Sequence, residues 1–362
     1  MKEGADGMDL TDKTTMVRQG EELDLKPVEQ FLKDSIPGLT GELKVEQFPS
    51  GYSNLTYLIK VGKKDLVLRR PPFGRKAKTA HDMGREYRIL SALNPVFPYC
   101  PKPLVYTEDE SIMGCTFYVM ERIGGIILRK NLPKGLELSP DQMRTLCENL
   151  LDVQYKLHSI YYKAIGLNGF GKPEGYVKRQ VEGWSERYKG AWTPDAPTFE
   201  KVMGWLHERM PPDYPRPTVI HNDYKFDNVV LNPANPLEII GVLDWEMATI
   251  GDPIMDLGNS MGYWVQDDDP PNFQAARMLP TNLPGALTRE EMVKRYESLA
   301  GITIDNFDFY LCFGLFRLAV IAQQIYYRFY HGQTKDERFK MLIFAVHILE
   351  EATNRAMSED GM

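Results

Sequence analysis

A polar stretch, HNDYKFDN at residues 221–228, constrains the fold of this chain more than any other sequence feature. It follows directly on the short apolar segment 218–220, and a second apolar segment, 239–243, runs straight into D-W-E at residues 244–246. Short apolar runs bounded by polar residues are typical of buried strands. The fold must therefore present a polar loop at the ends of two short strands.

The residues before this stretch, 43–121, have the pattern of a small antiparallel sheet. Apolar residues alternate along 55–61, and a turn at 62–65 leads into a further strand at 66–69. A helix is expected at about 79–93. The remaining strands are expected at 43–48, 104–107 and 115–120.

After a hinge at 121–125 the pattern becomes largely helical. Capping boxes at 139–142 and 288–291 mark two helix starts. The apolar run 309–322 is shorter than the about 20 residues of a spanning helix and contains Arg317, so it predicts a buried core helix. We expect an α+β fold of two lobes, a small antiparallel-sheet lobe with one main helix and a larger, mostly helical lobe. The expected ranges are a polar N-terminal tail at 1–24, an N-terminal lobe at 25–123 with the hinge at its end, and a C-terminal lobe at 124–362.

Composition excludes several classes of protein. The 362 residues include 43 Lys and Arg against 50 Asp and Glu, a net charge of −7, which offers no electrostatic footprint for nucleic acid or an anionic membrane. The four cysteines are too widely spaced for a zinc site or a disulfide framework and suit a reducing compartment. The first 24 residues have no apolar stretch resembling a signal peptide. We therefore expect a cytoplasmic protein with neither a nucleic-acid nor a membrane partner.

Asp223, Asn228 and Asp244 supply the groups that transfer of a phosphoryl group to an alcohol requires. A carboxylate must orient the hydroxyl and accept its proton, and oxygen ligands must hold Mg²⁺ against the phosphates. A polar loop with capped turns and no chemistry is the alternative. The order of His, Asp, Asn and a strand-terminal Asp is specific and favours the chemical interpretation.

Two other residues of the loop have open roles. Lys225 lies two residues after Asp223, where a cation could neutralise charge on the transferring phosphoryl group. An exposed lysine without such a role is an equal alternative. We expect His221 to be a packed, hydrogen-bonded anchor of the loop rather than an acid or a base.

The N-terminal lobe should hold ATP. The turn at 49–54 lies between the first two strands, where backbone N–H groups can approach a phosphate. With a single glycine it is also compatible with an ordinary hairpin. Its candidate phosphate-facing residues are Ser50, Gly51, Ser53 and Asn54.

Arg69 and Glu86 form a candidate buried pair. Arg69 ends the third strand, where protein kinases have a phosphate-binding lysine. Glu86 shares one helical stripe with Met83 and Leu90, which places its carboxylate on an apolar face. Because a buried charge needs a partner, Arg69 is the candidate partner of Glu86. The alternative is that Glu86 pairs with another residue or lies at the edge of the stripe.

The segment after D-W-E predicts a helix start. Asp252 is placed to cap it with Pro253 in the first helical position, and Asp256 in the first turn is free to accept backbone N–H bonds from the 221–228 loop. Only seven residues separate Asp244 from Asp252. That leaves no room for the long activation segment of protein kinases, which disfavours a protein substrate.

With these residues assembled, the chain resembles the aminoglycoside phosphotransferase and choline kinase-like family, small-molecule relatives of protein kinases. The loop 221–228 corresponds to the family's H-x-D-x-x-x-x-N, and D-W-E replaces its D-x-E or D-F-G. The resemblance implies a bilobal protein-kinase-like fold that uses ATP and Mg²⁺. It implies Asp223 as base and Asn228 and Asp244 as Mg²⁺ ligands. The adenine-facing hinge would be Met120, Glu121 and Ile123.

Within this family, GYSNLTY, LVLRRPP, REYRIL and YVMERIGG resemble one branch. It includes kinase-like domains fused to acyl-CoA dehydrogenases, and it implies phosphorylation of a 4-hydroxyacyl-CoA such as 4-hydroxyvaleryl-CoA. An aminoglycoside or choline-type kinase is the first alternative. A pseudokinase that binds nucleotide without turnover is the second. A partner subunit or a homo-oligomer is left open.

A basic segment at 171–189 bears on the choice of substrate. A CoA thioester calls for Arg and Lys, whereas a cationic substrate calls for acidic groups. A solvated helix face explains these charges almost as well. Tyr263 and Trp264 are candidates to line an acyl passage, or they belong to the core. The charged residues of the segment, interspersed with Trp184, include Lys172, Lys178, Arg179, Arg187 and Lys189.

Overall fold

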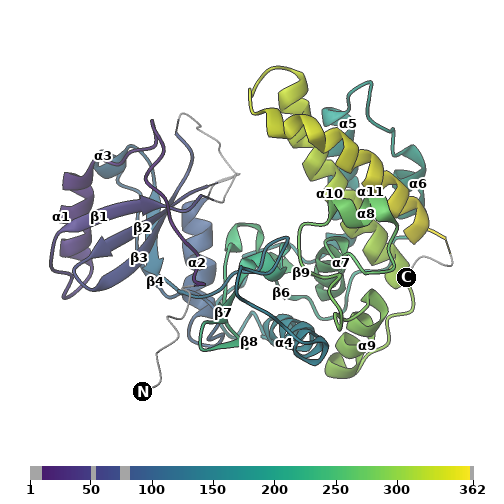
Figure 1. Cartoon of the computed structure of the whole chain (residues 1–362), viewed down its shortest axis with the longest axis horizontal. Helices are drawn as coiled ribbons and strands as arrows, with labels where there is room; N and C mark the ends of the chain where they lie inside the picture. The colour runs from purple at the N-terminus through teal and green to yellow at the C-terminus, as the bar shows by residue number, and fades with distance from the viewer. Residues whose placement is uncertain (1–9, 50–53, 74–81, 359–362) are drawn as a thin grey trace. The chain divides into compact units, whose positions relative to one another are not determined.

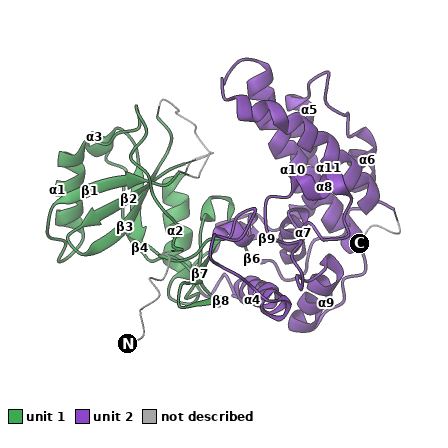
Figure 2. Ribbon diagram, in the orientation of Figure 1, with its two compact units in different colours: residues 1–127, 165–167, 229–248 green, residues 128–164, 168–228, 249–362 purple. Residues whose placement is uncertain are grey.

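The computed structural model describes residues 10–49, 54–73 and 82–358, and the chain divides into two compact units (Figure 2). Unit 1 comprises residues 1–127, 165–167 and 229–248, and unit 2 comprises the rest of the chain. These units differ from the two contiguous ranges expected from the sequence. The difference arises because the chain enters unit 1 again at 229–248, where it forms a hairpin.

Five antiparallel strands form the sheet of unit 1, in the order β1-β2-β3-β5-β4 (Figure 1). The strands expected from alternation are present, although the last one begins later than residue 115. Their bounds are β1 (Leu43–Gln47), β2 (Leu55–Val61), β3 (Lys64–Arg70), β4 (Pro103–Thr107) and β5 (Phe117–Glu121).

The two faces of this sheet have different partners. Leu66 and Leu68 of β3 belong to a core that includes Val28 and Leu32 of α1 (Leu25–Ser35). Because successive side chains of a strand point to opposite faces, Arg69 points away from this core. The helix α2 (Met83–Leu93), which contacts β4 and β5, meets Arg69 there. This helix begins at Met83, and Asp82 is its N-cap. Residues 79–81 of the expected helix lie outside the described residues.

Residues 10–24 are not a free tail where the structure describes them. The backbone of Thr15 exchanges two hydrogen bonds of 2.9 Å with Gln47, so this segment adds a bridge to the edge strand β1. The buried Gln47 side chain accepts a further bond from the backbone N–H of Arg18.

Unit 1 also contains α3 (Glu110–Met113), the hairpin of β7 (Val229–Asn232) and β8 (Asn235–Val242), and the 3₁₀ turn η2 (Trp245–Met247).

Unit 2 is mostly helical. Both predicted capping boxes are confirmed, at Ser139 and at Thr288, where each hydroxyl and the Gln or Glu three residues later bond reciprocally. A two-stranded sheet of β6 (Thr218–Ile220) and β9 (Thr249–Gly251) leads into and out of the polar loop region. The helices are α4 (Pro140–His158), α5 (Tyr176–Ala191), α6 (Glu200–Glu208), α7 (Pro253–Gly262), α8 (Pro271–Ala276), α9 (Arg289–Ala300), α10 (Phe307–Tyr330) and α11 (Leu342–Ala356). Two 3₁₀ turns, η1 (Phe226–Asn228) and η3 (Glu337–Met341), complete the described elements.

The apolar helix α10 forms the core of unit 2. It packs against α5, α7 and α11. By length and composition it is the one described helix that could cross a membrane, but 78% of its most apolar window is buried inside the structure. The contact with α7 depends on small residues, because a Cβ at Gly258 would overlap the carbonyl oxygen of Tyr310. The prediction of a buried core helix is confirmed.

Candidate active site

Arg69 in unit 1 holds three carboxylates together. Its Nη1 lies 3.3 Å from Oε1 of Glu86, and its Nη2 lies 3.1 Å from Oδ1 of Asp244. The same Nη2 lies 3.5 Å from Oε2 of Glu246. The predicted pairing of Arg69 with Glu86 is confirmed, and the two acidic residues of D-W-E join the same cation.

Burial makes this pairing necessary. The side chains of Arg69 and Glu86 are only 8% and 3% exposed. Burial raises the pKa of Glu86, and Arg69 acts against that shift. Burial also disfavours the charge of Arg69, but Glu86 and the other nearby acidic groups outweigh it and raise the pKa of Arg69. Each charge therefore depends on the other to persist in a dry environment.

Asp244 sits in an unusual backbone conformation at the start of η2. Its φ is 65°, in the left-handed region that residues other than glycine rarely adopt. The indole Nε1 of the buried Trp245 donates to the carbonyl of Val242 at 2.8 Å, which ties this turn to the end of β8. The Asp244 side chain is 37% exposed and is therefore accessible, unlike Glu86. Strained residues of this kind cluster at functional sites.

Glu246 and Asn54 are joined within unit 1. The Nδ2 of the buried Asn54 donates to Oε2 of Glu246 at 2.7 Å. Asn54 is the last residue of the turn at 49–54 that was expected to face phosphate, and Ser50, Gly51 and Ser53 of that turn lie outside the described residues. Sequence reasoning assigned no role to Glu246, although its position two residues after Asp244 was a signal that could have indicated one.

In unit 2, Asp223 is held by two donors of its own loop. The Nζ of Lys225 lies 3.0 Å from Oδ2 and 3.1 Å from Oδ1 of Asp223. The Nδ2 of Asn228 donates to Oδ2 at 2.9 Å and to the Asp223 carbonyl at 2.8 Å. Charge-assisted bonds of this kind orient a carboxylate. The Asp223 carboxylate thus has a fixed direction.

Lys225 is only slightly exposed, which disagrees with the alternative of an exposed lysine, and its role towards the phosphoryl group stays a prediction. Its side chain is 12% exposed, and its Nζ lies 4.3 Å from the ring centroid of Tyr263 and 3.8 Å from Oδ1 of Asp227. Burial disfavours its charge, but Tyr263, Asp223 and Asp227 outweigh that effect and raise the pKa of Lys225. Burial raises the pKa of Tyr263 itself to about 12. Lys225 is therefore a permanent cation beside Asp223.

Asn228 and Asp244 have the chemistry that Mg²⁺ prefers. Because Nδ2 of Asn228 faces Asp223, its Oδ1 is directed elsewhere, and the partly exposed Asp244 offers a carboxylate. Within the described ranges, no group of three or more His, Cys, Asp or Glu side chains could hold a metal ion by itself. Magnesium bound together with phosphates retains water and phosphate oxygens and needs only one or two carboxylates from the protein. Asn228 in unit 2 and Asp244 in unit 1 each offer one oxygen ligand of that kind.

A buried carboxylate fixes the backbone of the loop, as predicted. Oδ2 of Asp256 accepts the backbone N–H of His221 at 3.0 Å, and Oδ1 accepts that of Asn222 at 2.6 Å. His221 is fully buried, and its Nδ1 accepts the backbone N–H of Asp223 at 3.2 Å. The prediction that His221 is a structural anchor is confirmed.

His158 is a residue of this anchor that sequence reasoning missed. Its Nε2 lies 2.9 Å from Oδ2 of Asp256, and its Nδ1 lies 2.8 Å from the hydroxyl of Tyr296. Burial alone would raise the pKa of Asp256, but the bond with His158 contributes most to lowering it. No local pattern indicated this role, because His158 ends α4, 98 residues before its partner.

Asp252 caps α7 as predicted and makes stability depend on pH. Its Oδ1 accepts the backbone N–H of Ile254, whereas its buried Oδ2 has no partner among the described residues. Burial raises its pKa from 3.8 to about 6. A raised carboxyl pKa contributes stability at low pH that is lost as the pH rises towards 6.

Asp252→Asn, which keeps the cap without the charge, should therefore gain stability relative to wild type between pH 4 and pH 7, by up to roughly 3 kcal/mol. Urea unfolding of both proteins across this range measures the difference, and parallel pH profiles would contradict it.

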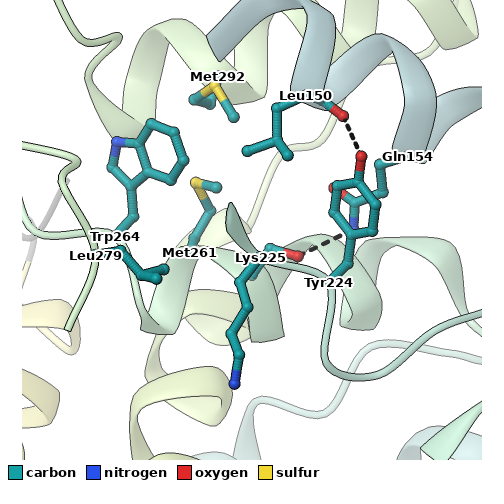
Figure 3. A pocket seen from close by; sticks show the side chains of 9 residues that line it. Leu150, Gln154, Tyr224, Lys225, Met261, Trp264, Leu279 and Met292 are labelled. Carbon is teal, nitrogen blue, oxygen red and sulfur yellow. Dashed lines mark hydrogen bonds between the residues drawn. The ribbon is translucent and has the colours of Figure 1, made fainter. Parts of the chain in front are cut away.

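A small apolar cavity lies behind Lys225 in unit 2. Figure 3 shows Leu150, Met261 and Met292 directed towards it, with the ring of Trp264, while the ammonium of Lys225 points away. Trp264 is buried and its Nε1 donates to the carbonyl of Leu287 at 2.8 Å. It therefore belongs to the core, whereas Tyr263 covers Lys225.

The expected hinge residues lie at the end of β5 and just beyond it. Met120 is buried opposite Val67 of β3, and Glu121 is exposed. Ile123 packs over Gly241 of β8. Their contact with adenine stays a prediction.

Comparisons with known proteins identify the family of this chain. Residues 44–279 match the profile of the Phosphotransferase enzyme family. Mouse acyl-CoA dehydrogenase family member 10 is 35% identical over 325 residues, which cover 89% of this chain and 30% of that protein. Human acyl-CoA dehydrogenase family member 11 is 32% identical over 345 residues, which cover 93% of this chain and 43% of that protein. The chain thus spans less than half the length of these relatives.

Solved structures share the fold. A Ralstonia eutropha protein classed with the aminoglycoside phosphotransferases has a TM-score of 0.78 at 30% identity, over 93% of this chain and 98% of that one. Choline kinase from Cryptosporidium parvum has a TM-score of 0.61 at 12% identity, over 93% of this chain and 99% of that one. At this identity the comparison shows a shared fold and nothing more. The chain belongs to the Phosphotransferase enzyme family and has a protein-kinase-like fold.

Proposed function

We propose that this chain transfers the γ-phosphoryl group of ATP, with Mg²⁺, to the hydroxyl of a 4-hydroxyacyl-CoA such as 4-hydroxyvaleryl-CoA. The observation that carries the reaction type is the carboxylate of Asp223, fixed between Lys225 and Asn228. Nucleotide use is supported by relatives of the same fold whose structures contain GDP or AMP-PNP.

In the proposed reaction, the acceptor hydroxyl donates a hydrogen bond to Asp223. Its oxygen forms a bond to the γ-phosphorus as the bond between that phosphorus and the bridging oxygen breaks, and ADP leaves. The proton of the hydroxyl passes to Asp223. The fixed cation of Lys225 stabilises negative charge on the phosphoryl oxygens.

The groups of unit 1 position the nucleotide in this proposal. Arg69 holds Asp244 and Glu246 in place, so Asp244 is ready as a ligand before the nucleotide binds. Bound Mg²⁺ would neutralise charge on the phosphates. Since Arg69 is already engaged by three carboxylates, its proposed role is to position Asp244 rather than to contact phosphate alone.

The relatives support an acyl-CoA acceptor. They are named as acyl-CoA dehydrogenase family members, and this chain matches 30% to 43% of their length. An acyl-CoA substrate for a domain joined to such an enzyme is chemically consistent, because both would act on the same thioester. The substrate of this chain is proposed on that basis.

The free hydroxy acid should react more slowly than its CoA thioester. Contacts to the remote CoA moiety position the reacting hydroxyl, so we expect kcat/KM for 4-hydroxyvalerate to be at least about 10-fold below that for 4-hydroxyvaleryl-CoA. Conversion of ATP to ADP across both compounds, choline and kanamycin measures this. Equal kcat/KM for acid and thioester, or faster turnover with choline or kanamycin, would refute the CoA assignment and leave the phosphotransferase assignment standing.

A further inference from the structure

Arg317 of α10 is a buried cation without an anionic partner. Its residue is 4% exposed, and within the described part of the chain it makes no hydrogen bond or ion pair. Its guanidinium carbon lies 5.1 Å from the ring centroid of Trp184. An aromatic face attracts a cation but offers no acceptor to the five N–H donors of a guanidinium.

Two other buried arginines of the described chain are paired with carboxylates, and the buried Arg70 donates to the carbonyl of Pro71 at 3.1 Å and lies over the ring of Phe73. Arg69 has its three carboxylates, and Arg289 donates to both oxygens of Asp269, each at 2.8 Å. Burying a charge is costly unless a partner compensates it. Arg317 has no carboxylate partner, and none of its nitrogens is among the fully buried polar atoms without a partner, so its donors keep some access to solvent and to a ligand.

A second arginine meets the same ring. The guanidinium carbon of Arg187, on α5, lies 4.6 Å from the ring centroid of Trp184, and this residue is exposed. Burial and the like charge of Arg317 lower the pKa of Arg187. Two cations that repel each other beside one ring favour an anion between or beside them.

The other basic residues of α5 are engaged elsewhere. Lys178 and Lys189 pair with glutamates of the same helix, at 3.8 and 2.9 Å, and Arg179 donates to backbone carbonyls at the helix start. Of the basic residues expected on this helix to recognise an anionic substrate, Arg187 is therefore the one that lies against the ring of Trp184, as Arg317 does.

The charge of Arg317 also reaches the residues around the catalytic loop. Burial raises the pKa of Tyr176 and that of Tyr263, and the positive charge of Arg317 acts to lower both. The hydroxyl of Tyr176 donates to Asn222 of the loop at 3.3 Å, and the ring of Tyr263 covers Lys225. All these residues belong to unit 2.

We propose that Arg187 and Arg317, together with Trp184, bind an oxyanion of the acceptor substrate. Guanidinium groups form paired, charge-assisted hydrogen bonds with phosphate and carboxylate, so the occupant is a phosphate of CoA or a carboxylate of the acceptor. The inference deepens the proposed function and rests on it for the identity of the molecule. The subsite excludes cationic acceptors by repulsion.

Removal of the Arg317 charge should weaken anion binding. We expect Arg317→Gln to reduce the affinity for coenzyme A or for 4-hydroxyvalerate by roughly 10- to 100-fold, and Arg317→Lys to lose less. Arg187→Gln should act in the same direction. Isothermal titration of the full chain with each compound separately identifies the source of the oxyanion, since coenzyme A supplies phosphates and 4-hydroxyvalerate a carboxylate.

Lys189→Gln provides the matched control, because Lys189 is an exposed cation on the same helix with its own glutamate. It should bind both compounds as wild type does. Arg317→Gln should unfold at or above the wild-type temperature, because it removes an uncompensated charge, whereas a purely structural arginine would lower that temperature. Wild-type affinity in Arg317→Gln, or no binding of either compound to wild type at millimolar concentration, would overturn the subsite. Arg317-dependent binding without phosphorylation of any acceptor would instead refute the proposed function alone.

Discussion

Asp223→Asn should lower turnover by roughly 10²- to 10⁴-fold while Mg²⁺-ATP binding is retained. The amide keeps the shape of the carboxylate but cannot accept the proton of the acceptor hydroxyl. Lys225 and Asn228 hold the wild-type carboxylate in one direction, so the loss should fall on kcat. A rate assay with an acceptor that supports wild-type turnover, combined with calorimetric titration of Mg²⁺-ATP, measures both quantities.

Asp244→Ala is the contrasting variant for this experiment. It removes a charged candidate metal ligand, so Mg²⁺-ATP binding itself should weaken. Thermal unfolding of both variants separates these effects from misfolding. Wild-type turnover in Asp223→Asn would remove this residue from the mechanism, and unchanged Mg²⁺-ATP affinity in Asp244→Ala would remove Asp244 as a ligand.

Loss of Arg69 from the buried pair in unit 1 should cost roughly 3–5 kcal/mol of unfolding free energy, because the buried Glu86 is left as an uncompensated charge. Arg69→Met leaves three carboxylates without their cation, whereas Glu86→Gln leaves Arg69 with Asp244 and Glu246. The arginine substitution should therefore be the more damaging. The double variant should lose far less than the sum of the two.

Urea denaturation of the four proteins of this cycle measures the coupling. Trp245 is the one tryptophan in the sequence of unit 1, and its ring lies 6.0 Å from that of Phe97, so its fluorescence reports on this unit. The other four tryptophans report on unit 2 and provide an internal control. Strictly additive losses would show that the two side chains do not stabilise each other.

Local features of the sequence were sufficient to predict several elements of this protein and its loop motif. The strands β2 and β3 follow from alternating side chains and a turn, and the starts of α4 and α9 follow from their capping boxes. The cap of Asp252 and the anchoring role of Asp256 were also predictable, because both residues act within one short helix start and the loop packed on it. Such signals depend on neighbours only a few residues apart.

Other features were decided by the tertiary structure alone. Arg69 lies 175 residues from Asp244, His158 lies 98 residues from Asp256, and Arg317 meets a tryptophan of a different helix. The sequence marked Arg317 only as a charge within an apolar run, and marked Arg187 as one of several basic residues. Which charges are paired and which lack a partner depends on the path of the chain. Segments distant in sequence are brought together by burial of apolar faces, and burial then determines how strongly each charge requires a partner.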